Sequence, residues 1–541
     1  MKRLISILAI ILLLSLCACD APNGDVTDTI SPNDTSSAFN TTEPHTDAPS
    51  SAPDTTAPET TAPDTTTTET ETETEAETDP ACNHADADDN GVCDLCTLSV
   101  LVSVDFYSIN DLHGKFFDTD SQPGVDELTT YLKSAQAANP NTVLLSAGDM
   151  WQGSSESNLT KGLILTDWMN ELDFAAMTLG NHEFDWGVDA ILANAELAEF
   201  PILAINIYER DTNTLADYCT PSVLVDKGEV QIGIIGAIGN CYSSISADKV
   251  QDYYFVLDSA LTELVKAESE ALRAQGADII VYAMHDGGGE YDYSLSNGYV
   301  DIVFEGHSHK DYVKKDSAGI YHLQGGGDND GITHATAKVN SVTGTVIVTT
   351  AEYMPTARYQ SFDDHPIVEQ LREKYADQLA AGNEKLGYNA KKRYSEQILQ
   401  KVADLYLACG QERWGEQYEI VLGGGFLSAR SPYDLEKGDV YYSDLQMLLP
   451  FDNQIVLCSI KGSELLSKFI NTSNNRYYIS LSDYGTDIKN SIDKNATYYI
   501  ITDTYCSSYA PNRLTVIDTY DQTTFARDLI ADYIKDGNWS K

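Results

Sequence analysis

Positively charged side chains are scarce in this chain of 541 residues. Its 34 Lys and Arg stand against 83 Asp and Glu, which gives a formal net charge of −49 at pH 7. Residues 20–97 contain 19 acidic side chains and no Lys or Arg, and the remainder of the chain is acidic as well. A negative field of this size opposes binding to nucleic-acid polymers and to anionic lipid surfaces. It does not exclude a small phosphate ester as substrate, because bound divalent cations reverse the charge locally.

Long apolar runs are also lacking, apart from residues 4–16 near the N-terminus. That run is too short to span a membrane comfortably, and the two basic residues before it are typical of an export signal. Residues 16–19 read Leu-Cys-Ala-Cys and resemble a bacterial lipobox, which predicts residues 1–19 as a lipoprotein signal peptide with the lipid on Cys19. The alternative is an ordinary signal peptide cleaved after Ala18. We expect a lipid-anchored protein on the extracellular face of the cell membrane.

Large apolar residues are nearly absent from residues 20–80, which consist mainly of Thr, Pro, Ser, Asp and Glu. Such a segment cannot bury enough apolar surface to offset the entropy that it would lose on folding. We therefore predict a disordered linker with an r.m.s. reach of roughly 45 Å. It would hold a folded body away from the membrane.

Cysteine is limited to ten unevenly placed residues, which argues against a fold held together by disulfides throughout. Cys219 and Cys241 could form a single bridge, and buried free thiols are the alternative. Three other cysteines gather in a small module over residues 81–97, for which three interpretations stay open. The first is a structural Zn²⁺ held by Cys82, His84, Cys93 and Cys96.

The second interpretation of this module is a Ca²⁺ loop, because Asp86, Asp88, Asn90 and Gly91 match the start of such a loop. Thr97, however, stands where the bidentate Glu of a Ca²⁺ loop is expected. The third interpretation is one disulfide with a polar turn. None of the three makes the module catalytic.

The chain from Leu98 onward has the pattern of an α/β fold and is too long for one hydrophobic core. Apolar runs of strand length occupy residues 100–107, 142–146, 174–179, 278–283 and 299–304. Amphipathic stretches of helix length lie between them, for example residues 187–199 and 257–275. This alternation predicts stacked sheets flanked by helices. A second α/β domain is predicted after the polar, Pro-containing segment 352–365.

Short polar runs directly follow these strands. They read Asn-Asp-Leu-His-Gly (110–114), Gly-Asp (148–149), Gly-Asn-His-Glu-Phe-Asp (180–185), Met-His-Asp (284–286) and Gly-His-Ser-His (306–309). Together they supply five of the ten His of the chain, with Asp and Asn side chains that can also bind metal. Open α/β folds form their sites at the C-terminal ends of strands, so these runs mark the predicted site.

The order Asp-x-His, Gly-Asp, Gly-Asn-His, His and Gly-His-x-His resembles that of the calcineurin-like metallophosphatases. The longer forms Asn-Asp-Leu-His-Gly and Gly-Asn-His-Glu-Phe-Asp resemble their 5′-nucleotidase branch. The resemblance implies a four-layer αββα metallophosphatase sandwich over residues 98–355 and a C-terminal α/β substrate domain over residues 366–541. It also implies two divalent metal ions, and the mixed nitrogen and oxygen ligands admit Zn, Mn, Fe or Co.

The resemblance assigns the metal ligands residue by residue. The first ion would take Asp111, His113, Asp149 and His309. The second ion would take Asp149, Asn181, His285 and His307. Asp149 would therefore bridge two ions, which together neutralise a phosphate ester and acidify the attacking water.

Two further residues are catalytic by the same resemblance. His182 would lie near the attacked phosphorus and stabilise charge in the transition state, while Asp185 would orient and charge the His182 ring. The nucleophile would be a metal-bound hydroxide that attacks in line with the leaving group.

Candidate substrate-binding residues lie in the second domain, where the resemblance weakens. Arg393 resembles an early Arg of the family and could bind a phosphate or a carboxylate. Phe451, in the run Leu-Pro-Phe-Asp-Asn (449–453), could stack on one face of a nucleobase. Tyr505 or Tyr509 would supply the other face.

The second domain also departs from the family pattern. Leu422 stands where the family usually has Asn, and Arg430 is displaced by three positions from the family's second Arg. The lead hypothesis is extracellular release of phosphate from nucleoside 5′-monophosphates or related nucleotides, such as 2′,3′-cyclic nucleotides and nucleotide sugars. The alternatives are a phosphomonoesterase for a non-nucleotide ester and, from a different class, a non-catalytic surface binding module.

Overall fold

The computed structural model describes residues 82–118, 123–286, 298–426, 433–470, 478–482, 488–508, 514–521 and 523–537. The chain divides into two units, Met1–Thr74 and Glu75–Lys541, and all the described residues belong to the second unit. The predicted lipidation site Cys19, the predicted linker 20–80 and the predicted substrate residues Arg430 and Tyr509 lie outside the described residues. Among the residues described, no helix combines the length and the apolar character that crossing a membrane requires.

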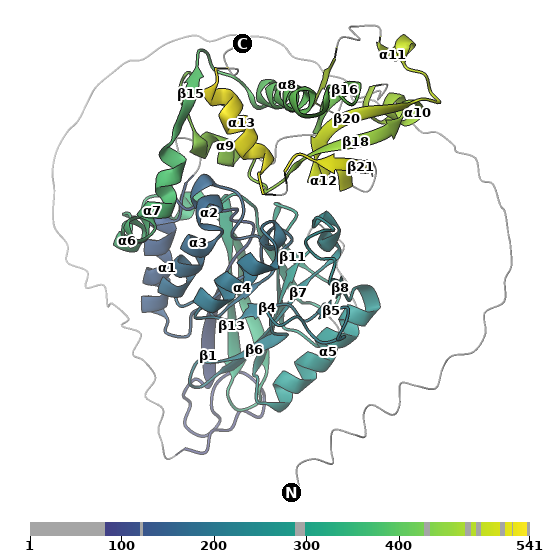
Figure 1. Cartoon of the computed structure of the whole chain (residues 1–541). Helices are drawn as coiled ribbons and strands as arrows, with labels where there is room; N and C mark the ends of the chain where they lie inside the picture. Colours follow the sequence, from purple (N-terminus) through teal and green to yellow (C-terminus); the bar gives the residue numbers. More distant parts are fainter. Residues whose placement is uncertain are drawn as a thin grey trace, which may run out of the picture. The chain divides into compact units, whose positions relative to one another are not determined.

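The N-terminal part of the described chain is built on two six-stranded sheets (Figure 1). The first sheet has the order β14-β13-β1-β2-β3-β4, with bounds Val346–Pro355, Gly331–Asn340, Leu101–Ile109, Val143–Ser146, Ala176–Thr178 and Ile202–Leu203. The second has the order β11-β12-β10-β9-β7-β6, with bounds Asp311–Lys315, Tyr321–Gly325, Ile302–Glu305, Ile279–His285, Gln231–Ile238 and Ser222–Asp226. The central strands β1 and β2 are parallel, as are β7, β9 and β10, so their C-terminal ends lie at one edge of each sheet.

The core between the two sheets is formed by side chains from the inner faces of both. Val104 and Phe106 of β1 belong to one buried cluster with Ile234 of β7 and Phe304 of β10. Successive side chains of a strand point to opposite faces, so Tyr107 of β1 packs in a different cluster, on the outer face of the first sheet. Strands buried on both faces explain why the sequence shows continuous apolar runs here.

Helices cover the outer faces of both sheets and complete four layers. The outer cluster of the first sheet contains side chains of α1 (Asp126–Ala138), α3 (Leu163–Glu171) and α4 (Val188–Leu197). The outer face of the second sheet packs on α5 (Asp258–Ala274), which lies on the other side of the sandwich (Figure 1). The predicted αββα sandwich is therefore confirmed.

The C-terminal part of the described chain is a smaller α/β domain built around a five-stranded sheet. Its order is β19-β16-β20-β18-β21, with bounds Tyr478–Leu481, Ile420–Phe426, Thr497–Asp503, Ile455–Lys461 and Thr515–Thr519. One face packs on α8 (Ser395–Trp414) and α13 (Ala526–Lys535), and the other on α10 (Gly462–Leu465). A Cβ on Gly423 of β16 would lie 2.5 Å from the backbone nitrogen of Leu407 in α8, so this glycine allows the helix to approach the strand closely.

Shorter elements complete the described chain. They are β5 (Ile207–Glu209), β8 (Tyr253–Phe255), β15 (Lys385–Asn389), β17 (Gly438–Tyr441), α2 (Ser155–Thr160), α6 (Pro366–Lys374), α7 (Ala376–Leu379), α9 (Tyr442–Leu448), α11 (Ile488–Ser491) and α12 (Thr504–Ser508). The sequence assigns α6 to the second domain, yet its Val368 and Leu371 pack in the core of the first. This helix therefore lies against the sandwich that precedes it.

The predicted strands and helices are observed in the structure, whereas the possible disulfide between Cys219 and Cys241 is not. The five apolar runs become β1, β2, β3, β9 and β10, and the two amphipathic stretches become α4 and α5. Cys219 and Cys241 are both free and buried. The Cys241 thiol donates to the carbonyl oxygen of His285 at 2.7 Å, and the Cys219 Sγ lies 3.5 Å from that of Ala204. Each sulfur thus has a backbone partner of its own, and the bridge is not formed.

Candidate dimetal site

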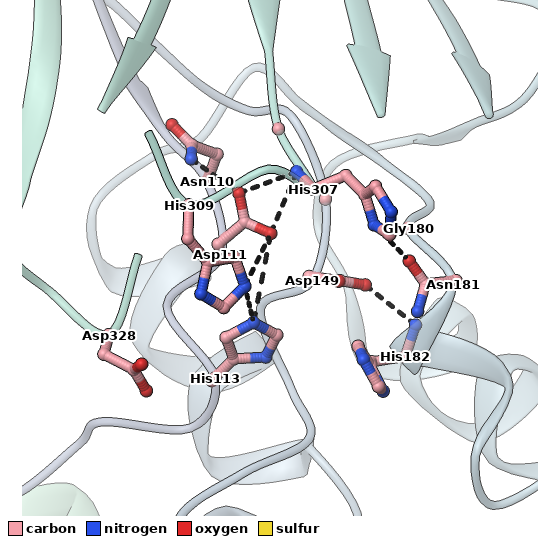
Figure 2. Close-up of polar contacts among 12 residues, drawn as sticks. Asn110, Asp111, His113, Asp149, Gly180, Asn181, His182, His307, His309 and Asp328 are labelled. Atoms are coloured by element: carbon pink, nitrogen blue, oxygen red, sulfur yellow. Dashed lines mark hydrogen bonds and ion pairs between the residues drawn. The ribbon is translucent and has the colours of Figure 1, made fainter. Parts of the chain in front are cut away.

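The seven predicted metal ligands lie together where strands of both sheets end. Figure 2 labels six of them, all except His285. Asp111 and His113 follow β1, Asp149 follows β2, Asn181 follows β3, His285 ends β9, and His307 and His309 follow β10. The first sheet supplies the acidic and amide ligands and one His, and the second supplies the other three His. The site is therefore complete only when the two sheets pack together.

Asp111, His113 and His309 form one group of candidate ligands. Their ligand atoms lie within 4.8 Å of one another. The Nε2 atoms of His113 and His309 are 2.9 Å apart, and they lie 3.9 Å and 3.7 Å from Oδ1 of Asp111. Two imidazole nitrogens and a carboxylate oxygen that converge in this way are a donor set that suits a divalent transition metal.

A second group of candidate ligands, Asp149 and His285, adjoins the first at Asp111, which belongs to both groups. Oδ2 of Asp149 lies 3.1 Å from Nε2 of His285. Nδ1 of His307 is 2.9 Å from Oδ1 of Asn181, and the backbone N–H of His307 donates to Asp111. The carboxylates of Asp111 and Asp149 therefore lie next to each other, and the bridging role of Asp149 stays a prediction.

Backbone carbonyls fix the proton position on two of the imidazoles. Nδ1 of His113 lies 3.0 Å from the carbonyl oxygen of Gln152, and Nδ1 of His285 lies 2.7 Å from that of Ala147. A carbonyl oxygen only accepts, so each Nδ1 carries a proton and donates it. Nε2 is then the atom that faces the other ligands, and in the neutral ring it offers a lone pair to a metal.

Five of the seven ligands have a left-handed backbone conformation. The φ angle is 50° at Asp111, 49° at His113, 55° at Asp149, 77° at His307 and 55° at His309. This region costs an L-residue other than Gly roughly 1–2 kcal/mol. Clusters of such residues are typical of functional sites, where the surrounding structure holds them in place. The loops that carry the ligands must therefore be fixed by contacts of their own.

Two carboxylates lie at the centre of the site, and both are removed from water. Asp111 is 0% exposed and Asp149 is 1% exposed. Burial, with the negative charge of Asp149 beside it, raises the pKa of Asp111 to about 7. The pKa of Asp149 is held well below its usual value despite burial, because His285 and His182 lie next to it. Two divalent cations would supply the positive charge that both carboxylates need, so the charge balance fits a dimetal site as well as the donor set does.

His182 lies beside the ligands and has a carboxylate partner of its own. Its backbone N–H donates to Oδ1 of Asp149 at 2.8 Å, and its ring lies edge-to-face with that of His113 at a centroid distance of 5.4 Å. Nδ1 of His182 is 2.7 Å from Oδ2 of Asp185. This carboxylate orients the ring. The structure thus brings together the two residues that the sequence predicts as catalytic.

Glu183 is a residue of this site that the sequence analysis missed. Its side chain is 0% exposed, and its carboxylate accepts four backbone N–H groups. The donors are Asp149 at 2.9 Å, Met150 at 2.8 Å, Trp151 at 3.2 Å and Gly180 at 2.7 Å. One side chain therefore ties the loop after β2 to the loop after β3. The signal in the sequence was a charged residue next to a Phe inside the motif at 180–185.

Asn110 fixes Asp111 through hydrogen bonds of its side-chain amide. The sequence analysis gave this residue no role either. Its Nδ2 donates to Oδ2 of Asp111 and to the carbonyl oxygen of Gly326, both at 2.7 Å, and its Oδ1 accepts from the N–H of Gly325 at 2.9 Å. The N–H of His307 adds contacts to both carboxylate oxygens of Asp111, at 3.0 Å and 2.8 Å (Figure 2). The carboxylate is therefore fixed from both sheets.

Phe451 connects the predicted catalytic and substrate residues. Its ring lies 6.2 Å from that of His182 with an interplanar angle of 21°, and 6.3 Å from that of Tyr505 with an angle of 17°. The three rings are thus close to parallel, with Phe451 next to both others. The sequence predicted Phe451 and Tyr505 for the two faces of a base, and the structure brings these two side chains together.

Arg527 is a third residue that the sequence analysis missed, and it fixes the loop that carries Phe451. It is 5% exposed, and its guanidinium bonds Oδ1 of Asp452 at 2.8 Å and the carbonyl oxygen of Leu449 at 2.9 Å. It lies in α13, more than seventy residues after this loop. No local pattern in the sequence could connect the two.

Arg393 makes its contacts within the second domain. Its guanidinium donates to Oδ1 of Asn389, and its backbone pairs with that of Leu435. Its role in binding substrate stays a prediction, as do those of Arg430 and Tyr509 outside the described residues.

Comparison with known proteins agrees with this geometry. Residues 105–311, which contain all seven ligands, match the family model described as calcineurin-like phosphoesterase. The apyrase of Tabanus yao is 34% identical over 215 residues, which cover 37% of this chain and 38% of that protein. UshA of Yersinia enterocolitica is 27% identical over 419 residues, which cover 66% of this chain and 74% of UshA. Residues 105–311 therefore form a calcineurin-like phosphoesterase domain, and the chain as a whole is similar to 5′-nucleotidases and UshA. It is a metallophosphoesterase, and the calcineurin-like domain implies a site for two metal ions.

A solved structure extends the likeness to both domains of this metallophosphoesterase. The crystal structure of the 5′-nucleotidase precursor from Thermus thermophilus aligns with a TM-score of 0.61 at 19% identity, over 80% of this chain and 96% of that chain. At this identity the likeness shows the fold, a metallophosphatase sandwich followed by a second α/β domain. By sequence, the chain matches well under half of the length of the apyrase and about three quarters of UshA.

Replacing Glu183 by Ala should lower both metal content and phosphatase activity, by roughly 10–100-fold, because four N–H groups would lose the acceptor that fixes two ligand loops. Glu183→Gln should have a similar effect, because the amide nitrogen is itself a donor and cannot accept hydrogen bonds from the backbone N–H groups. Metal analysis of the purified chain and turnover of an aryl phosphate measure the two effects. Glu171→Gln, exposed at the end of α3, is the matched control. Wild-type metal content in Glu183→Ala would show that the loops hold without this carboxylate.

Proposed function

We propose that this metallophosphoesterase hydrolyses the phosphate ester of nucleoside 5′-monophosphates or related nucleotides, such as 2′,3′-cyclic nucleotides and nucleotide sugars. The observation that carries the proposal is that two groups of ligands converge on the neighbouring carboxylates of Asp111 and Asp149. Two dications that share one carboxylate are an arrangement suited to phosphoryl transfer. The relatives described as apyrase and 5′-nucleotidase support nucleotides as the substrate class.

The ligand groups would divide between two divalent ions. Asp111, His113, Asp149 and His309 would hold one, and Asp149, Asn181, His285 and His307 the other. Bound there, the ions neutralise the ester, activate the attacking water and stabilise the leaving oxygen. The chain itself keeps the ligands oriented before substrate arrives, through the carbonyls that fix the imidazole protons and through the carboxylate of Glu183.

His182 would act on the phosphoryl group. Asp185 occupies its Nδ1 at 2.7 Å, which leaves Nε2 as the nitrogen that acts on substrate. A proton on Nε2 would donate to a phosphoryl oxygen as negative charge develops in the transition state. The carboxylate of Asp185 keeps the ring in the orientation that this donation requires. The pair therefore supplies charge stabilisation from the protein side of the substrate.

Phe451 and Tyr505 would hold the base of the nucleotide. Their rings are almost parallel, and their 6.3 Å separation is close to the roughly 7 Å that one intervening ring needs at van der Waals contact on both sides. A small movement of Tyr505, which lies in the short helix α12, would admit a base. Because Phe451 also lies next to His182, a base bound here would bring its phosphate toward the metal ligands.

A phosphomonoesterase for a non-nucleotide ester is the second candidate, and one observation favours it. Leu422, at the position where the family usually has Asn, is 0% exposed and packs in the hydrophobic cluster between the five-stranded sheet and α10. It cannot replace a polar contact to substrate. The non-catalytic binding module is set aside, because the chain is a metallophosphoesterase with its ligand set intact.

Replacing Asp149 by Ala should abolish turnover and reduce metal content, because the carboxylate predicted to bridge the two ions is lost. Replacing His182 by Ala should lower kcat by about 10²–10⁴-fold while metal content stays near that of the wild type. Steady-state kinetics and metal analysis on the same preparations separate the two roles. Loss of metal from His182→Ala would contradict the role assigned to this residue.

Replacing Tyr505 or Phe451 by Ala should raise KM for AMP by roughly 5–150-fold, the equivalent of about 1–3 kcal/mol of base stacking. KM for a small aryl phosphate, which has no base, should change much less. Tyr388→Ala, an exposed tyrosine of β15 that is 50% exposed, is the control. Equal losses on both esters would contradict a base site. A wild-type preference for the aryl ester over AMP, 2′,3′-cyclic AMP and UDP-glucose would overturn the nucleotide proposal and favour the second candidate.

We further propose that the protein is exported and carries a lipid on Cys19, which anchors it to the extracellular face of the cell membrane. The support is the lipobox-like run at residues 16–19 after a short apolar segment. Cys19→Ser should move the full-length protein from the membrane fraction to the soluble fraction, with its activity on an aryl phosphate unchanged. Membrane binding that persists in this variant would contradict the anchor.

A further inference from the structure

A second cluster of metal-binding side chains lies outside the dimetal site, in residues 82–96. The ligand atoms that lie within 4.8 Å of one another belong to Cys82, His84, Cys93 and Cys96. Backbone hydrogen bonds close the end of this segment, since the N–H of Cys93 donates to the carbonyl of Leu98 and the N–H of Thr97 to that of Cys93, both at 2.8 Å. Three sulfurs and one imidazole nitrogen thus converge in a small loop.

The distances in this cluster match a tetrahedral zinc site. The Sγ atoms of Cys82 and Cys93 are 3.8 Å apart, whereas a disulfide would bring them to about 2.05 Å. Ligands at the usual Zn–S distance of about 2.3 Å place neighbouring sulfurs about 3.8 Å apart in a tetrahedron. Sγ of Cys96 lies 3.4 Å from Nδ1 of His84, and the same geometry gives about 3.6 Å for a sulfur and an imidazole nitrogen. The spacing therefore has room for one ion between four ligands.

The carboxylates of the same segment serve another purpose. Asp86 accepts the N–H groups of Asn90 at 3.0 Å and Gly91 at 2.8 Å, and the side-chain amide of Asn340 at 2.6 Å. Asn340 ends β13, so Asp86 joins the loop to the β13–β14 hairpin. A Ca²⁺ loop would need these oxygens and a bidentate Glu where Thr97 stands. The sulfur and nitrogen ligands favour Zn²⁺ instead.

The cluster lies at the other end of β1 from the dimetal site. The N–H of Val100 donates to the carbonyl of Gly91 at 3.0 Å, and Val92 pairs with Ser99, directly before β1 begins. The dimetal ligands follow β1, which is nine residues long, and nine residues of strand extend about 30 Å. An ion in this cluster therefore has no part in the hydrolysis.

We propose that residues 82–96 bind one structural Zn²⁺ through Cys82, His84, Cys93 and Cys96. The ion would close this loop onto the start of β1 and the β13–β14 hairpin. The thiolate is the form that binds zinc, so the three thiols release their protons on binding and no sulfur is oxidised or reduced.

Cobalt substitution tests this proposal on the whole chain, because Co²⁺ bound by thiolates gives an intense sulfur-to-metal charge-transfer absorption that nitrogen and oxygen ligands do not give. The metal-free protein titrated with Co²⁺ should show this absorption, and added Zn²⁺ should remove it. Alkylation of the native zinc-containing protein followed by mass spectrometry should find Cys82, Cys93 and Cys96 without a disulfide among them. These two measurements need no variant, so they apply even if a substitution prevents folding.

Matched variants then place the thiolates. Cys96→Ser and His84→Ala should each lower the affinity for Co²⁺, measured by this absorption, at least tenfold. Turnover of an aryl phosphate should stay near that of the wild type. Cys458→Ser, which removes a cysteine buried in β18, should leave the absorption unchanged. Absorption that persists in Cys96→Ser and disappears in Cys241→Ser would place the thiolate beside the dimetal site and overturn the proposal. A disulfide between any two of the three cysteines, or no charge-transfer absorption, would overturn it as well.

Discussion

Two buried carboxylates at the junction of two sheets are the constraint on which the rest of the structure depends. Asp111 and Asp149 are withdrawn from water, and a buried negative charge is stable only beside positive charge and hydrogen-bond donors. Part of that support comes from His285 and from the N–H of His307, which the second sheet supplies. Packing of the two sheets and assembly of the site are therefore one event, and metal ions bound there would stabilise the folded sandwich.

The strands and the seven ligands could be predicted from the sequence because their signals are local. A buried parallel strand is an apolar run, and a polar run that follows it marks the edge where sites form. The left-handed φ angles of five ligands had no such signal, since only Gly announces that conformation reliably. Glu183, Arg527 and α6 could not be predicted for a related reason. Their partners lie on other loops or another domain, and no spacing in the sequence records those contacts.

Among the described residues, the second domain reaches His182 through the loop that carries Phe451. Arg527, buried in α13, fixes that loop by its contacts with Asp452 and Leu449, and the loop places Phe451 between His182 and Tyr505. Chemistry and substrate choice thus depend on different parts of the chain. In the proposed function, the chemistry depends on the ligands of the sandwich, and the choice of substrate depends on aromatic side chains of the second domain.

Anomalous X-ray diffraction from crystals of the metal-loaded protein tests the central claim most directly. Our account predicts two anomalous peaks at the ends of β1, β2, β3, β9 and β10, each at about 2.0–2.2 Å from an oxygen of Asp149. A single peak, or two peaks of which only one contacts this carboxylate, would contradict the dimetal site on which the proposed function rests.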